Sequence, residues 1–152
     1  MLFTPNELRT FLAECKATIA EINYAQAVVD DSQMANLLQA IAIDENLLLF
    51  GVIPDYTADS RDEDGVMFEN GFDLLLVKKT QDNNQTQNDF LDTMNECLMV
   101  VRALITFIFQ KKLNDNCGVF YYLNEGSFQI SPVWKKSGTD GWMISFNLRT
   151  DL

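Results

Sequence analysis

Residues 90–112 read FLDTMNECLMVVRALITFIFQKK. Apolar side chains recur there at steps of three and four residues for more than four turns, which predicts one long amphipathic helix. The positions that hold this period are Phe90, Met94, Cys97, Leu98, Val101, Leu104, Ile105 and Ile108. We expect the helix to begin near Asn88 or Asp89 and to end near Asn114. It separates two groups of predicted strands, so the order of elements around it decides the fold class.

Two strand regions precede this helix. Residues 47–53 form an apolar run closed by Pro54, too short for a typical helix, which predicts a strand buried on both faces. Residues 66–79 form the second strand region, and a turn or bulge would fall at Asn70-Gly71. The polar segment 81–87 that follows is expected to be an exposed loop.

The last part of the chain is typical of antiparallel strands. Residues 119–123 are a candidate strand, and Phe128 and Ile130 alternate with polar neighbours further on. The final strand, residues 141–148, alternates Trp142, Ile144, Phe146 and Leu148 with less apolar side chains, which predicts one buried face.

The N-terminal part predicts two helices. Thr4-Pro5-Asn6-Glu7 has the residues of a capping box with proline at the first helical position. Residues 24–31 are ambiguous between a short strand and a helix extension. A second helix would follow, capped by Asp31 or Ser32.

Together these elements predict one α+β domain over residues 1–152, with an antiparallel sheet packed by the long helix and the N-terminal helices. The chain has 152 residues, of which 47% are hydrophobic and 22% charged, as in ordinary globular domains. Its longest apolar runs are far shorter than a membrane span, so no membrane partner is expected.

Few catalytic motifs are compatible with this sequence. It contains no histidine, which removes histidine-dependent triads and histidine general bases. The nucleophile elbow, the P-loop and the dinucleotide fingerprint are absent too. Cys15, Cys97 and Cys117 lack metal-ligand spacing and indicate a reducing compartment. We therefore expect no enzyme, no cofactor and no metal, although two carboxylates alone can support catalysis.

Charge is distributed unevenly along the chain. The net charge is −11. Residues 1–77 hold fourteen acids and three bases, whereas residues 78–152 hold eight of each. An acidic surface repels DNA phosphates and anionic lipid, so sequence-specific nucleic-acid binding is not expected. Solubility alone also explains such acidity.

Residues 55–65 concentrate part of this charge and predict an exposed acidic loop. Its acids are Asp55, Asp59, Asp62, Glu63 and Asp64. Aligned with an EF-hand calcium loop, Gly65 takes position 6 and Gly71 takes position 12, where a bidentate glutamate is required. A metal site is therefore disfavoured, and the loop is a candidate lumen-facing or partner-facing surface.

Aromatic residues flank a basic turn near the C-terminus. Trp134 and Trp142 enclose Lys135 and Lys136, which makes this hairpin a candidate interface because tryptophan is favoured at interface hot spots. The alternative is that both tryptophans pack under the helices as core residues.

The order of elements resembles that of small neck and tail-completion proteins of tailed bacteriophages, the class of tail terminators and head–tail connectors. The closing strand, Gly141-Trp142-Met143-Ile144-Ser145-Phe146-Asn147-Leu148, resembles closing strands of the form Gly-Trp-x-x-x-Phe-x-Leu in such proteins. The resemblance implies a virion protein without catalytic residues, assembled in the bacterial cytoplasm. Its partners would be further copies of itself, in a ring through which DNA passes, and neighbouring virion proteins.

Two other readings stay open at this point. One is a small acidic intracellular protein-binding module, such as an immunity, inhibitor or chaperone-like protein, whose acidic face complements a basic partner. The other is a carboxylate-dependent enzyme.

Overall fold

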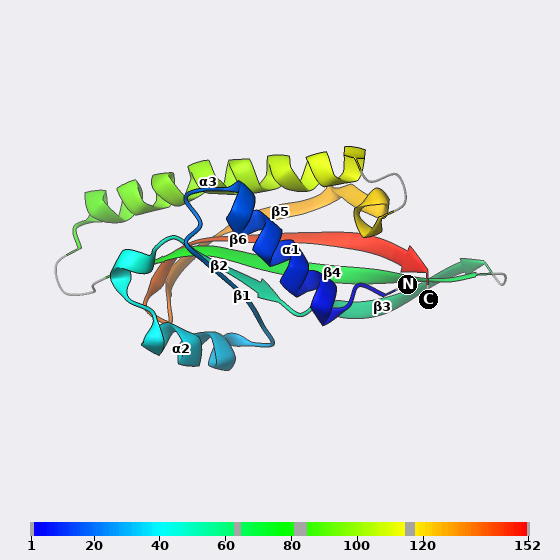
Figure 1. Ribbon diagram of the computed structural model, residues 1–152, viewed down its shortest axis with the longest axis horizontal. Helices are drawn as coiled ribbons and strands as arrows, with labels where there is room; N and C mark the ends of the chain where they lie inside the picture. Colours follow the sequence, from blue (N-terminus) through cyan, green and yellow to red (C-terminus); the bar gives the residue numbers. More distant parts are fainter. Residues whose placement is uncertain (1, 63–64, 81–84, 115–117, 152) are drawn as a thin grey trace.

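The computed structural model describes residues 2–62, 65–80, 85–114 and 118–151. It confirms the α+β class: helices pack on one mostly antiparallel sheet (Figure 1). The helices are α1 (Pro5–Thr18), α2 (Asp31–Ala40) and α3 (Gln87–Asn114), with short 3-10 turns η1 (Ile43–Glu45) and η2 (Val119–Tyr122). The strands are β1 (Tyr24–Val28), β2 (Leu48–Val52), β3 (Asp55–Asp62), β4 (Gly65–Lys79), β5 (Leu123–Lys136) and β6 (Thr139–Asp151).

Strand β4 is the centre of the sheet. The order is β1-β2-β4-β6-β5, and β3 pairs with β4 outside this path. Along one side of β4, β2 pairs with residues 74–77 and β3 with residues 65–71, while β6 pairs with residues 67–79 on the other side. Only the β1–β2 pair is parallel among these ladders, because α2 connects the two strands as a crossover. Strands β3 and β4 form a hairpin arm that extends past the body of the molecule (Figure 1).

Helices cover the two faces of the sheet unequally. Helices α1 and α3 pack on one face, over a core that includes Leu12, Leu76 and Phe146. Helix α2 packs on the other face against a smaller cluster that includes Phe50 and Val77. Because burial of this kind is the main stabilising force in folding, the larger core holds α1 and α3 on the sheet.

Local signals place the helix starts. Thr4 caps α1, and its side chain and that of Glu7 form the predicted capping box. Asp30 caps α2 by accepting a hydrogen bond from the Gln33 N–H, so the prediction of Asp31 or Ser32 was wrong by one or two residues. Helix α3 begins at Gln87 and ends at Asn114, which confirms the predicted long helix.

The predicted acidic loop at residues 55–65 is the clearest correction. Residues 55–62 are strand β3, paired in antiparallel register with β4. Asp55, Thr57 and Asp59 alternate along it with Tyr56 and Ala58, and β4 supplies the partner backbone that a strand requires. The side chains of residues 55–58 are exposed on both faces of the strand, so the segment shows no apolar alternation in its sequence.

Other boundaries also differ from the predictions. Residues 24–28 are strand β1, which resolves that ambiguity. Residues 119–122 form η2 instead of a strand, since Phe120 is buried while Tyr121 and Tyr122 are exposed. Strand β4 runs through Asn70-Gly71 without a turn. The buried Asn70 amide donates to the Leu148 carbonyl and the Thr150 hydroxyl, and its Oδ1 accepts from the Phe3 N–H.

Candidate interaction surfaces

The described residues do not converge on a catalytic constellation. Within these ranges, no group of three or more Cys, Asp or Glu side chains lies so that it could hold a metal ion. Burial raises the pKa of the Cys97 thiol to about 12 and that of the Cys15 thiol further still. These two thiols therefore stay protonated near neutral pH and are poor nucleophiles. None of the described helices combines the length and the apolar character that crossing a membrane requires.

Two of the predicted acidic site residues have described side chains on the hairpin arm. Asp55 and Asp59 lie on β3, with Asp55 exposed and Asp59 half-buried. Arg149 of β6 donates from Nη2 to Asp59 Oδ2 at 3.0 Å, so this carboxylate is engaged within the chain. The side chain of Asp62 and the whole of Glu63 and Asp64 lie outside the described residues.

An acidic surface continues from the arm along the sheet face opposite α1 and α3. Asp55 pairs in register with Gly71, Glu69 with Arg149, and Asp73 with Ser145. Because side chains alternate between faces, Asp55, Glu69 and Asp73 all share this face, beyond the cluster under α2. Asp73 accepts a hydrogen bond from the Ser145 hydroxyl at 2.5 Å.

The two tryptophans of the predicted interface hairpin have different environments. Trp142 is half-buried beneath α3, and its indole N–H donates to the Met94 carbonyl at 3.0 Å. Trp134 on the edge strand β5 is 68% exposed, with the Lys135 ammonium 5.5 Å from its ring centroid. The core interpretation is therefore correct for Trp142 and wrong for Trp134, and the structure separates the two residues that the prediction grouped.

The β5–β6 turn holds Trp134 and Lys135 in a fixed geometry. Ser137 and Gly138 both have positive φ, 53° and 77°, as a tight two-residue hairpin turn requires. The buried Asp140 carboxylate accepts from the Lys135 backbone N–H at 2.8 Å. Lys136 forms an ion pair with Asp31 of α2 at 2.9 Å, so its charge is used within the chain.

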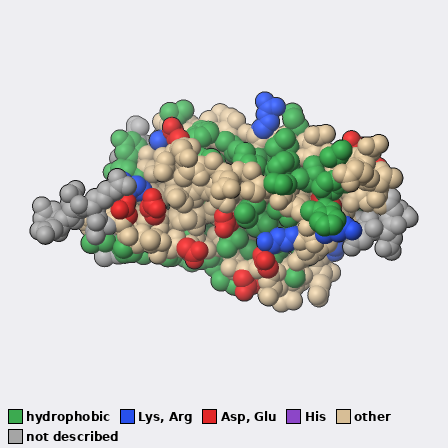
Figure 2. All heavy atoms as spheres, turned by 180° about the vertical axis from the view of Figure 1, so that it is seen from behind, with side chains coloured by type: hydrophobic (Ala, Val, Ile, Leu, Met, Phe, Trp, Pro, Cys, Tyr) green, Lys and Arg blue, Asp and Glu red, His purple; other side chains and the backbone are tan. Residues whose placement is uncertain are grey.

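Hydrophobic side chains gather near this turn. Figure 2 shows them over the half of the molecule that contains the turn and the N-terminal end of α3. Ile130, Pro132 and Trp134 of β5 are exposed, and so is Leu91 near the start of α3. We call Ile130, Pro132, Trp134 and Lys135 the β5 patch.

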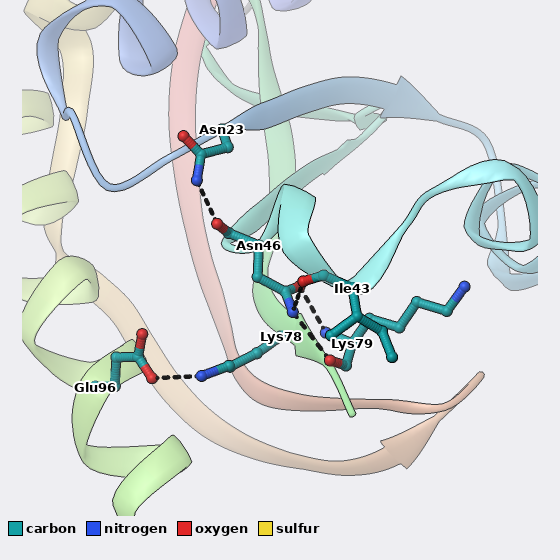
Figure 3. Close-up of polar contacts among 6 residues, drawn as sticks. All are labelled: Asn23, Ile43, Asn46, Lys78, Lys79 and Glu96. Atoms are coloured by element: carbon teal, nitrogen blue, oxygen red, sulfur yellow. Dashed lines mark hydrogen bonds and ion pairs between the residues drawn. The ribbon is translucent and has the colours of Figure 1, made fainter. Parts of the chain in front are cut away.

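A polar cluster joins the segment before β2 to the end of β4 (Figure 3). The Asn46 amide nitrogen donates to the carbonyls of Ile43 and Lys79, at 2.8 and 2.9 Å, and its Oδ1 accepts from the Lys79 N–H at 2.8 Å. Asn23 donates to the Asn46 carbonyl, and Lys78 pairs with Glu96 of α3 at 2.8 Å. The Asn46 side-chain amide thus bonds to both backbone groups of Lys79, at the end of β4, in the way that the backbone of a neighbouring strand would.

An open groove of about 460 Å³ lies beside this cluster. It runs between α3 and the segments that precede β1 and β2, and its lining residues are Glu21, Asn23, Asn46, Leu47, Glu96, Met99 and Val100. We call it the α3 groove. Leu47 and Val100 are buried and form an apolar floor, Met99 is 62% exposed, and Glu21 is exposed at the rim.

Sequence reasoning did not predict the α3 groove. Its lining comes from three separate segments that the fold brings together, and no local pattern joins them. One signal was present: Met99 is an apolar residue that falls outside the periodic positions of the long helix. An apolar side chain at such a position is a candidate contact for another molecule.

A second hollow of about 260 Å³ lies between α1, the C-terminal part of α3 and η2. Phe3, Phe11 and Phe120 line it, and Glu14 bridges to Lys111 at its rim. The aromatic rings contact one another, with Phe11 and Phe120 centroids 5.1 Å apart, so this hollow is the margin of the core.

Comparison with known proteins adds no family assignment: no protein-family model matches the chain, and no curated protein matches its sequence.

Proposed function

We propose that this protein is a structural protein of a tailed-phage neck or tail end, which assembles with copies of itself into a ring that DNA passes through. Two observations support the proposal. One is the resemblance in the order of elements, and the other is that the sheet has strands of the acidic part of the sequence on one side of β4 and strands of the neutral part on the other.

This opposition carries the proposal. Residues 1–77 hold the whole net charge and include α1, α2, β1, β2 and β3, whereas residues 78–152 are neutral and include α3, β5 and β6. Strand β4 lies between β2 and β6 in the sheet. In the sheet, the strands β1 and β2 of the acidic half and the strands β6 and β5 of the neutral half therefore lie on opposite sides of β4, each pair ending in an edge strand.

Two unlike sides favour head-to-tail association. When one surface of a molecule complements a different surface of the next copy, the contact repeats, and it closes into a ring if the rotation between copies allows. A two-fold dimer would instead place the same surface against itself, and two acidic sides repel one another.

The acidic sheet face is the candidate lining of the channel. Asp55, Glu69 and Asp73 lie on the face beyond α2, and like charges facing a lumen would repel DNA phosphates and keep the polymer sliding. Replacing Asp55, Glu69 and Asp73 together with the corresponding amides should then impair DNA passage. Unchanged infectivity of a phage carrying the three substitutions would contradict the lumen assignment.

The assembly state tests the proposal as a whole. The purified chain is measured by light scattering across a concentration series, with negative-stain imaging of large species. A single species of several copies with ring-shaped images is the expected result. A chain that stays monomeric at every concentration contradicts it and favours the acidic protein-binding module, whose test is a one-to-one complex with a basic partner.

A further inference from the structure

Of the three described helices, α2 alone lies on its face of the sheet, whereas α1 and α3 share the other (Figure 1). It buries two of its side chains, Met34 and Leu38, while α3 buries seven. Because stabilisation by burial follows the apolar area removed from water, the apolar face of α2 holds it far less strongly than that of α3 holds α3. The sheet residues buried beneath α2, which we call the covered face, are Phe50, Leu75, Val77 and Val133.

Polar contacts hold both ends of α2, and those at its C-terminal end are the stronger. Lys79 Nζ, at the end of β4, donates to the Leu38 carbonyl at 2.7 Å and to the Ile41 carbonyl at 2.8 Å. A cation is favoured there because the last carbonyls of a helix lack partners four residues on and carry the negative end of its dipole. The other end is held by the ion pair of Asp31 with Lys136, in which Asp31 is 74% exposed, so solvent screens the attraction.

The backbone of Lys79 is fixed independently of α2. Its N–H and carbonyl bond to the Asn46 side chain at 2.8 and 2.9 Å, and it pairs in register with Thr139 of β6. Lys79 can therefore release the two α2 carbonyls by rotation of its side chain alone, with the sheet unchanged. A hollow of about 280 Å³ adjoins this side chain, and its lining residues are Ala35, Leu38, Gln39, Lys79 and Ser137.

We propose that α2 is a lid over the covered face, which opens as a unit while the rest of the chain stays folded, and that Lys79 is the latch that holds it closed. Opening exposes the apolar covered face and leaves the larger core under α1 and α3 intact. An element with few buried contacts opens at a lower free energy than the whole molecule unfolds. This inference goes beyond the proposed function and does not rest on it, because it concerns a single copy.

Two neighbouring residues of β4 form a matched pair for detecting the opening. Leu75 lies on the covered face and Leu76 in the larger core, and each is at most 2% exposed. Leu75→Cys and Leu76→Cys, each in a Cys117→Ser background, are treated with a thiol reagent under native conditions, and mass spectrometry follows the labelling. We expect the thiol introduced at position 75 to react at least about tenfold faster than the one at position 76. Cys15 and Cys97, buried in the larger core, report the opening of that core in each variant.

Substitution of the latch tests the role of Lys79. Lys79→Met, added to the Leu75→Cys variant, should accelerate labelling at position 75 at least about tenfold, because hydrogen bonds to a charged group are lost. Lys79→Gln keeps a donor without the charge, should give an intermediate rate, and replaces Lys79→Met where that variant does not fold. Lys78→Met is the matched control, because it removes the neighbouring ion pair with Glu96 of α3 and should change labelling at position 75 less than about twofold.

The lid and the latch can each be overturned. Labelling at position 75 no faster than that at position 76 and at Cys15 and Cys97 would show that α2 opens only when the whole molecule unfolds, which overturns the lid. Labelling that Lys79→Met accelerates no more than Lys78→Met does would overturn the latch. Both experiments are carried out at protein concentrations where the chain is a single copy, so neither result depends on ring assembly.

Discussion

The two halves of strand β4 show how differently one strand can be stabilised along its length. From Leu74 to Val77 its side chains are buried between helices on both faces of the sheet. From Gly65 to Glu69 the side chains are exposed or half-buried, and the strand is held by the ladders to β3 and β6. Backbone pairing is therefore the main support of the arm, beside the Tyr56 hydrogen bond to the Phe3 carbonyl and the Asp59–Arg149 ion pair, whereas apolar burial stabilises the body. Substitutions in the body should therefore lower the free energy of unfolding far more than substitutions in the arm.

The largest difference is expected between two glycine positions. A Cβ at Gly141 would lie 2.1 Å from the Leu76 carbonyl oxygen and 2.8 Å from the Val77 Cα, both backbone atoms that cannot move without separating β4 from β6. Gly141→Ala should cost about 4 kcal/mol or more, beyond ordinary overpacking. A Cβ at Gly65 in the arm meets nothing within 4 Å, so Gly65→Ala should leave the free energy of unfolding nearly unchanged. Urea unfolding of both variants measures the difference, and equal stabilities would contradict the account.

Truncation of apolar side chains should follow the same division. Leu76 in the body is fully buried between α3 and the sheet, and Leu76→Ala should lower the free energy of unfolding by about 3 kcal/mol. Met67 in the arm is half-buried, and Met67→Ala should cost about 1 kcal/mol because less surface is re-exposed. Chemical denaturation gives both values, and a larger loss for Met67→Ala would reverse the assignment of core and arm.

The sequence predicted the elements whose signals are local. The capping box at Thr4, the helical period of α3 and the alternation of β6 each predicted an element that the structure confirms. Strand β3 was missed because its stability comes from a partner strand and not from its own side chains. Residues 119–122 were misassigned because an apolar run fits a buried strand and a short helical turn equally well.

The candidate surfaces could be predicted only in part, since exposure depends on the order of strands. Trp134 and Trp142 occupy similar positions in one hairpin, yet α3 lies over β6 and leaves the edge strand β5 exposed. Local pattern does not encode which strand becomes an edge. The α3 groove was not predictable for the same reason, because Glu21, Asn46 and Met99 meet only in the folded chain.

The side chain that ties β2 to the end of β4 allows a smaller test. Asn46→Ala removes three hydrogen bonds, to the Ile43 carbonyl and to both backbone groups of Lys79. The expected cost is about 2 kcal/mol, because partly buried backbone groups lose their partners. Thr57→Ala on the exposed face of the arm is the control and should cost less than about 0.5 kcal/mol. A cost for Asn46→Ala no greater than that of the control would show that the cluster of Figure 3 does not stabilise the sheet.

The smallest effect is expected for the ion pair of the arm. The side chains of Arg149 and Asp59 are 34% and 26% exposed, so solvent screens their attraction. A double-mutant cycle with Arg149→Met and Asp59→Asn should give a coupling of less than about 1 kcal/mol, smaller still at high salt. A coupling of several kcal/mol would mean that the arm depends on this pair and not on its backbone ladders.

The symmetry of the assembly tests the central claim most directly. Image averaging of the assembled wild-type protein should show closed rings of more than two copies, all in the same orientation, with the β5 side of each copy against the β1–β2 side of its neighbour. A dimer with a two-fold axis, in which the same surface of both copies meets, would contradict the head-to-tail association from which the proposed function is built.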